Sequence, residues 1–266
     1  MAVTYNSSQG DGSSSTTSVV ITKPTSTAEG DLLIAQIVMS DNSLTITAPS
    51  VWTLINSTTV TGGQKSSIYY KIATASEGAN YTWSWSFAIE AGGYVSRFTG
   101  HLPSAPINTS NATADTSSSS TLTQNGITPT TASCMLVFFT SNFENRSVSG
   151  YAIATSNPTW TERYDDGTSL ARLSMATAIR PETTSTGNAT ATLSGSSTHK
   201  IGQIIAIEPG VDVTVSADLL TINNTIGNPD KQVSTLDIGI GLQEPFVDEW
   251  EKKEKSTSTW TNTPKT

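Results

Sequence analysis

The sequence contains two similar stretches that are offset by 108 residues (160 − 52 and 188 − 80). Trp52-Thr53 recurs as Trp160-Thr161, and Asn80-Tyr81-Thr82 recurs as Asn188-Ala189-Thr190. Around both pairs the order of segments is the same: an apolar run, a polar loop ending in proline, a tryptophan segment, a second apolar run, a threonine-rich alternating segment and a closing segment. A period of about 100 residues is too long for a solenoid repeat and suits a whole small domain. We therefore predict two tandem copies of one domain.

Both copies read as short β-strands separated by turn residues. Residues 32–39 form a nearly continuous apolar run, which is typical of a central strand buried on both faces. Residues 44–47 and 81–87 alternate with the period of two that a half-buried strand requires. Roughly seven such segments follow one another within a domain, and no segment has the pattern of an amphipathic helix. The sequence therefore predicts an all-β fold of antiparallel β-sandwich, jelly-roll-like domains.

The spacing of polar segments suggests three parts. Residues 1–102 form the first predicted domain, in which 6–18 is a polar lead-in with turn character. Residues 103–210 form the second, beginning with a polar linker or surface loop over 103–120. Residues 211–266 contain two alternating segments and a charged end, which is too little for an independent core. We expect this short C-terminal β arm to dock on its own sandwiches, on another subunit or on a larger assembly.

Composition narrows the class of protein. Charged residues make up 14% of the chain, below the roughly 25% of ordinary soluble domains, and serine and threonine take their place. The net charge is −8, and basic residues cluster only at 252–255, so we expect no nucleic-acid partner. No apolar stretch approaches the roughly 18 residues of a membrane span.

The first residues, 1–8, lack the basic and apolar regions of a secretory signal. A surface rich in hydroxyl groups without such a signal suits a virion component that is made in the host cytoplasm and released by lysis. A signal removed from the chain, or export by a route without such a signal, would produce the same pattern.

Few residues suggest chemistry. His101 and His199 lie in polar loops without metal-ligand spacing, and Cys134 lies in a probable core strand. Glu162 and the pair Asp165-Asp166 could ligate Ca²⁺, but Asp165-Asp166-Gly167 reads better as an ordinary hairpin turn. We therefore expect no catalytic residue, no cofactor and no bound metal.

Two further hypotheses concern the tryptophan residues. Trp83 and Trp85 could stack against sugar rings, although aromatic residues on one face of a strand more often build a core, which is the reading we favour. Trp250 and Trp260, with Phe246, lie among charged and hydroxyl residues near the end of the chain. They are candidate partner-binding residues, and a tail folded back on its own sandwich is an equal alternative.

Five short runs stand out in the first copy, namely Gly30 to Ala35, Pro49 to Leu54, Tyr69 to Ala73, Tyr81 to Ser84 and Phe98 to Gly100. Together they resemble a β-sandwich module of tailed-phage virion proteins, which also occurs in phage-like regions of bacterial genomes and in some secreted adhesins. Residues 18–100 carry the resemblance best and 121–210 more loosely, and residues 259–265 are similar to the short Trp-Thr-Asn tails of phage structural chains.

The resemblance implies a non-enzymatic structural protein on the surface of a tailed-phage virion, most simply a capsid decoration protein or head fibre. Its expected partners are other virion proteins and further copies of itself. The alternative is a tail-fibre or adhesin-type module that recognises cell-surface glycans. A hydrolase that uses Asp165 or Glu162 is a distant third hypothesis.

Overall fold

A computed structural model describes residues 1–167 and 171–211, and every regular element in these ranges is a β-strand. This confirms the predicted all-β class. The strands are β1 (Thr4–Thr22), β2 (Leu32–Met39), β3 (Thr53–Thr59), β4 (Lys65–Ile72), β5 (Asn80–Thr99), β6 (Ile107–Asp115), β7 (Ser119–Gln124), β8 (Cys134–Asn142), β9 (Val148–Ile153), β10 (Thr161–Gly167), β11 (Arg172–Arg180), β12 (Ala189–Ser197) and β13 (Lys200–Ile207).

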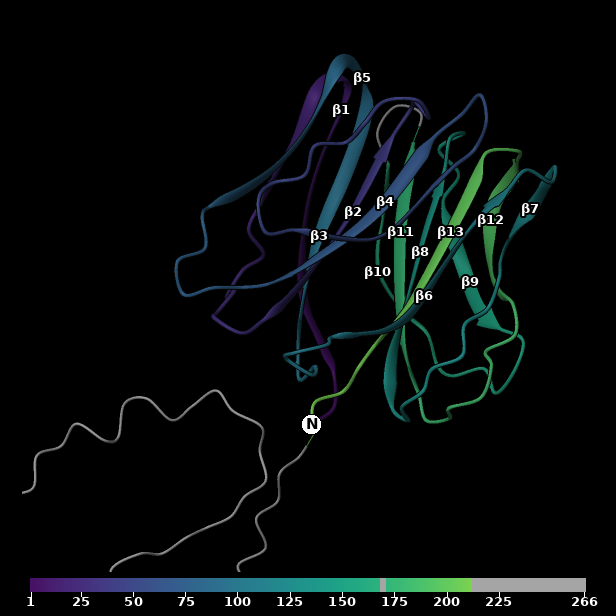
Figure 1. Cartoon of the computed structure of the whole chain (residues 1–266). Helices are drawn as coiled ribbons and strands as arrows, with labels where there is room; N and C mark the ends of the chain where they lie inside the picture. The colour runs from purple at the N-terminus through teal and green to yellow at the C-terminus, as the bar shows by residue number, and fades with distance from the viewer. Residues whose placement is uncertain (168–170, 212–266) are drawn as a thin grey trace, which may run out of the picture. The chain divides into compact units, whose positions relative to one another are not determined.

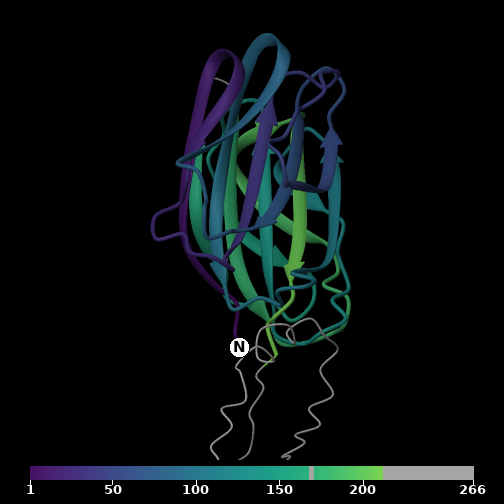
Figure 2. The same ribbon diagram turned by 60° about the vertical axis from the view of Figure 1, so that its left-hand side comes forward.

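The strands form three antiparallel sheets, which Figure 1 shows side by side. The first sheet has the order β1-β5-β2-β4-β3, and the second has the order β10-β11-β8-β13-β6. The third sheet contains β7, β12 and β9, with β12 in the middle. In both views the strands run lengthwise through the body, and the N-terminus lies at one end of it (Figures 1 and 2).

The sheet order repeats as the sequence does. Read from its other edge, the second sheet runs β6-β13-β8-β11-β10, which matches β1-β5-β2-β4-β3 strand for strand. The third sheet has its counterpart inside the first: residues 80–84 of β5 pair with residues 18–22 of β1 as β12 pairs with β7. The duplication is therefore present in the strand pairing, with two long strands in the first copy where the second copy has four shorter ones.

Each copy encloses a core of its own. In the first, Val19, Ile21 and Trp83 pack against alternate residues of β2 and against Trp52. In the second, Leu122 and Ala191 occupy the matching side, and Trp160 packs at the edge of the cluster. Trp52 and Trp160 thus hold corresponding positions, as their shared spacing predicts.

A third core joins the two copies. Leu32, Ile34 and Phe98 of the first sheet pack with Val137 and Phe139 of the second sheet. The described residues 1–167 and 171–211 accordingly lie within one compact unit. The domain boundary predicted at residue 102 stays a prediction. The structure adds a core that is shared by residues on both sides of this boundary.

Buried glutamines extend this contact beyond the apolar core. Gln36 Nε2 donates to the Thr140 carbonyl at 3.1 Å, and Gln64 Nε2 donates to the His199 carbonyl at 2.8 Å. From the opposite side, Gln203 Nε2 donates to Asn56 Oδ1 at 2.7 Å. Because a buried amide without partners is costly, these bonds fix the register of one sheet on the other.

Three local predictions need correction. Residues 6–18, predicted to be a polar lead-in, belong to strand β1. Strand β6 lies within residues 103–120, predicted to be a linker or surface loop. Both are edge strands, whose backbone pairing with a neighbour does not require apolar side chains. The strand predicted at 44–47 reduces to a single bridge between Thr47 and Ser84, while Leu44 and Ile46 still pack on the core.

The shared core predicts coupled stability. Phe139→Ala should lower the free energy of unfolding by about 3–5 kcal/mol. Because Phe139 packs between the first and second sheets, hydrogen exchange should accelerate in β2 and β4 as well as in β8. Leu193→Ala, in the core of the second copy, is the control and should act mainly on the second and third sheets. Unchanged exchange in the first sheet of the Phe139 variant would contradict the coupling.

Candidate functional site

The residues proposed to bind a partner lie outside the part of the chain that the structure describes. These are Phe246, Trp250 and Trp260, and their role stays a prediction. The described chain reaches Gly210 at the end of the body where it also begins. The Met1 amine donates to the Gly210 carbonyl at 2.6 Å, and the Gly210 amide donates to the Gly100 carbonyl at 2.8 Å.

Trp83 and Trp85 are core residues, so the proposal that they stack against glycans is wrong for both. Trp83 has no exposed surface and Trp85 is 7% exposed. The Trp83 ring packs against Trp52 at 5.0 Å between centroids, and Trp85 Nε1 donates to the Thr16 carbonyl at 2.9 Å. The side chains of Trp83 and Trp85 face inward because β1 and β5 fold over β2 at this point. A sugar ring cannot reach a face that the core already covers.

The acidic loop of the second copy is committed to internal contacts. Arg172 Nε pairs with Asp165 Oδ1 at 2.8 Å, and Asp165 Oδ2 accepts the Val148 amide at 3.1 Å. Tyr94 donates its hydroxyl to Asp166 at 2.7 Å. Strands β10 and β11 pair antiparallel up to Gly167 and Arg172. Asp165, Asp166 and Gly167 therefore belong to strand β10, and the prediction that they form the turn itself is wrong. Among the described residues, no group of three or more His, Cys, Asp or Glu side chains is placed to hold a metal ion.

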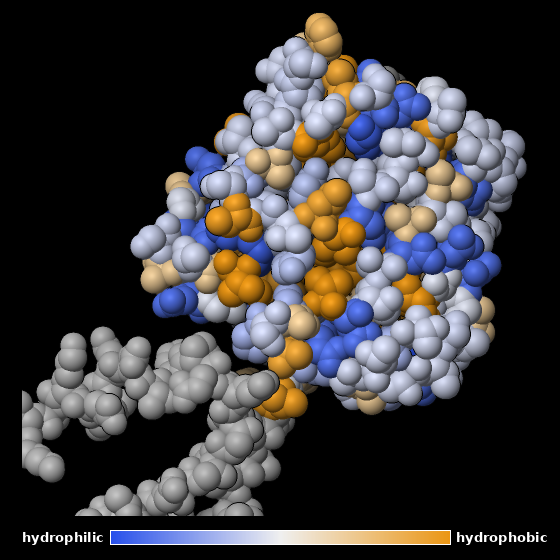
Figure 3. Space-filling model, viewed as in Figure 1, coloured by the Kyte–Doolittle hydropathy of each residue, from blue (hydrophilic) through white to orange (hydrophobic). Residues whose placement is uncertain are grey.

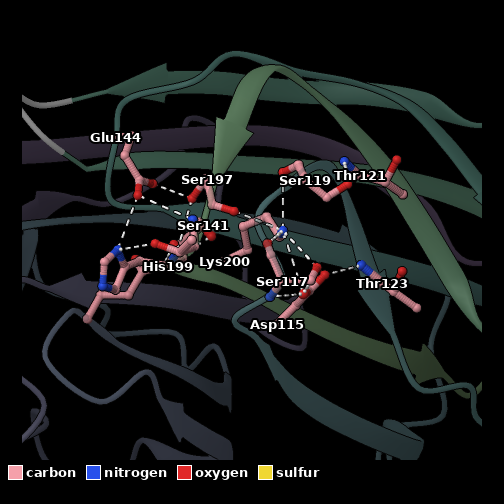
Figure 4. Close-up of polar contacts among 12 residues, drawn as sticks. Asp115, Ser117, Ser119, Thr121, Thr123, Ser141, Glu144, Ser197, His199 and Lys200 are labelled. Atoms are coloured by element: carbon pink, nitrogen blue, oxygen red, sulfur yellow. Dashed lines mark hydrogen bonds and ion pairs between the residues drawn. The ribbon is translucent and has the colours of Figure 1, made fainter.

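Glu144, Ser197 and His199 form the cluster that most resembles a catalytic constellation (Figure 4). His199 Nδ1 lies 3.1 Å from Glu144 Oε1, and the Ser197 hydroxyl donates to Glu144 Oε2. Burial raises the pKa of Glu144, but the bonds from Ser197 and His199 outweigh it and lower the pKa. A hydrolytic triad needs the histidine between serine and acid, whereas here the acid lies between them. The cluster ties two loops together.

Lys200 lies beside this cluster and is fully buried. Its ammonium donates to the carbonyls of Ser117, Ser119 and Ser197 at 2.5, 3.2 and 3.0 Å, and Asp115 Oδ1 lies 3.6 Å away (Figure 4). Because the ammonium donates to three carbonyl oxygens and lies beside Asp115, the side chain acts as a clamp between strand ends. The clamp closes the two breaks that separate β6 from β7 and β12 from β13.

The other predicted sites are also structural. His101 is buried at the junction of the copies, where burial lowers the pKa of its imidazole despite the opposing charge of Asp31. Sequence reasoning missed Lys200 and the buried Arg180, which donates to the carbonyls of Thr155, Thr184 and Ser185. The only sequence signal for either residue is a single basic side chain next to an apolar run.

Comparisons with protein-family models, with curated protein sequences and with solved structures found no match. The described residues include no helix long and apolar enough to cross a membrane. The class of the protein therefore rests on its fold, an all-β body of stacked antiparallel sheets.

The thiol of Cys134 should be unreactive in the folded protein. Burial and the nearby Glu208 raise its pKa to about 11, and the thiol donates to the Thr131 carbonyl at 3.2 Å. The thiolate is the reactive form. We expect an aromatic disulfide reagent to modify Cys134 at pH 8 only after unfolding in guanidinium chloride. Rapid modification of the native protein would contradict this placement.

Glu77 should make stability depend on acid pH. Burial raises the pKa of Glu77, but bonds from Lys71, Thr74 and Tyr81 outweigh it and lower the pKa to about 2. Because the pKa of Glu77 in the folded protein lies below its ordinary value of 4.5, the stabilisation is complete above that pH and disappears as the pH falls towards 2. Glu77→Gln should therefore cost about 2 kcal/mol at pH 7 and little near pH 2.

Urea unfolding of wild type and Glu77→Gln at several pH values measures this difference. The exposed Glu29, changed to Gln, is the control for the loss of one negative charge. A cost that stays constant between pH 7 and pH 2 would show that the carboxylate is not responsible.

Proposed function

We propose that the protein is a non-enzymatic structural component of a tailed-phage virion, exposed on the particle surface as a capsid decoration protein or head fibre. The resemblance of residues 18–100 to virion β-sandwich modules is the sequence support for this proposal. The stacked sheets are the structural support, because such a body presents large faces without needing a catalytic centre.

The observation that carries the proposal is how the protein uses its buried charged groups. Lys200, Arg180 and Glu77 each hold loops or strand ends, through two or more contacts in every case. Glu144 and Asp165 do the same on the second copy. Ionisable side chains that are engaged in such ties stabilise a shape.

The outer surface suits exposure outside a cell. The face in Figure 3 consists mostly of residues of intermediate hydropathy, with hydrophobic residues gathered in a stripe down its middle. Hydroxyl-rich strands hydrogen-bond with water and with one another, and β1 alone contains eight Ser or Thr between Ser7 and Ser18.

Attachment to the particle is assigned to residues 211–266. Gly210 lies beside Met1 at one end of the body, directly before this segment. Aromatic anchors in a polar segment are suited to ordering on a partner surface. The proposed partners are other virion proteins and further copies of this chain.

Replacing the anchors tests this assignment. A phage whose gene carries Trp250→Ala and Trp260→Ala should assemble particles with at least about tenfold less of this protein, because truncating aromatic hot spots costs about 2 kcal/mol or more each. Quantitative mass spectrometry of purified particles measures the content, and Ser258→Ala is the matched control. Normal incorporation of the double variant would contradict the role of the tryptophans. Absence of the wild-type protein from particles would contradict the virion assignment itself.

A further inference from the structure

A cavity of about 200 Å³ lies between the first and second sheets, beside β1, β5 and the β10–β11 hairpin. The part from the first sheet is mostly glycine, namely Gly10, Gly12, Gly92 and Gly93, together with Asp11 and Tyr94. The part from the second sheet includes Asp166 and Leu173. Elsewhere the same two sheets are joined by the shared apolar core and the buried glutamines.

The cavity exists because glycines replace side chains on the inner face of the first sheet. Facing sheets pack about 10 Å apart, so side chains must fill the space between them. Gly10 pairs with Tyr94 and Gly12 pairs with Gly92, and residues two apart on a strand share a face. Tyr94 reaches the second sheet and stacks on Tyr164 with 4.0 Å between centroids. The glycines beyond it leave the space empty.

Backbone conformation does not require these glycines. None of Gly10, Gly12 and Gly92 has a positive φ, so other residues could adopt the same conformation. At Gly10 a Cβ atom would lie 2.5 Å from the Tyr94 ring, so this glycine makes room for the tyrosine. In the second copy the pair that corresponds to Gly12 and Gly92 is Ala114 with Ile201, which carries side chains. The hollow is therefore a property of the first copy alone.

The polar groups around the cavity are held in place. Asp166 Oδ2 accepts the Tyr94 hydroxyl at 2.7 Å, and Oδ1 accepts the Gly167 amide at 2.8 Å. These two bonds lower the pKa of Asp166, so its carboxylate is charged at neutral pH and keeps lone pairs for further donors.

We propose that this cavity binds one neutral sugar ring, the terminal residue of a surface glycan. A sugar hydroxyl both donates and accepts, so adjacent hydroxyls can donate to the Asp166 carboxylate and to the Tyr94 hydroxyl oxygen, which keeps its lone pairs while it donates to Asp166. Among the described residues, no group of three or more His, Cys, Asp or Glu side chains is placed to hold a metal ion, which argues against a metal ligand here. An anion would meet Asp166 in a protein of net charge −8. The volume is below the roughly 300–1,000 Å³ of pockets for drug-sized ligands, which limits the ligand to about one ring.

The site adds a recognition function to the structural role, and it does not depend on where in a virion the protein resides. It also replaces Trp83 and Trp85 as the place where a glycan could bind. Both faces of the Tyr94 ring are covered, one by Tyr164 and the other by Gly10, so recognition here relies on hydrogen bonds and not on ring stacking.

Saturation-transfer NMR on the full chain tests the proposal. The probes are D-glucose, D-galactose, N-acetyl-D-glucosamine and L-rhamnose, each at about 10 mM, together with ethanolamine as a cation and acetate as an anion. We expect at least one sugar to bind with a Kd of about 1 mM. Asp166→Asn should weaken binding at least about tenfold, since it removes hydrogen bonds to a charged acceptor.

A second variant keeps the test independent of the charge. Gly12→Phe should fill the cavity and abolish binding, with thermal unfolding used to show that the variant remains folded. Glu29→Gln, at an exposed position by the start of β2, loses the same charge and should bind as wild type does. The proposal is overturned if no sugar binds, if only ethanolamine or acetate binds, or if both cavity variants bind as wild type does.

Discussion

The burial of β2 and β8 on both faces is the constraint on which the rest of the structure depends. Alternate residues of each strand face the core of their own copy and the core that both copies share. Each strand therefore belongs to two layers, and loosening one layer exposes apolar surface of the next. This arrangement makes the stack continuous, with the five-stranded sheets back to back and the other parts of each copy on the outside.

Sequence patterns predicted this part of the fold well. The apolar run at 32–39 became β2 with the same bounds, because a strand buried on both faces leaves an uninterrupted apolar signal. The duplicated tryptophans also mark corresponding positions. Edge strands escaped prediction because their stability comes from backbone pairing, which composition does not reveal. The polar segments 6–18 and 107–115 are the examples, and both are strands.

Candidate sites were harder to predict because single residues change meaning with their surroundings. Trp83 and Trp85 have the same spacing whether their side chains face a sugar or a core. Only the packing of β1 and β5 over β2 decides between these two alternatives. His199 and Ser197 are near one another in sequence, but Glu144, more than fifty residues away, determines that they serve as a tie. The glycines of the cavity carry no signal of their own, since turn residues are common throughout this chain.

The two copies differ most where their strands differ in continuity. In the second copy β6 and β7, and likewise β12 and β13, are separate strands, and Lys200 clamps both breaks with Asp115. The pair that corresponds to Lys200 and Asp115 in the first copy is Ala91 with Ser13, within strands that run on without a break. Continuous strands need no clamp, and their inner face can tolerate glycine beside the Tyr94–Tyr164 stack. The second copy thus closes its strand breaks with a buried charge, and the first copy keeps an open space between the sheets.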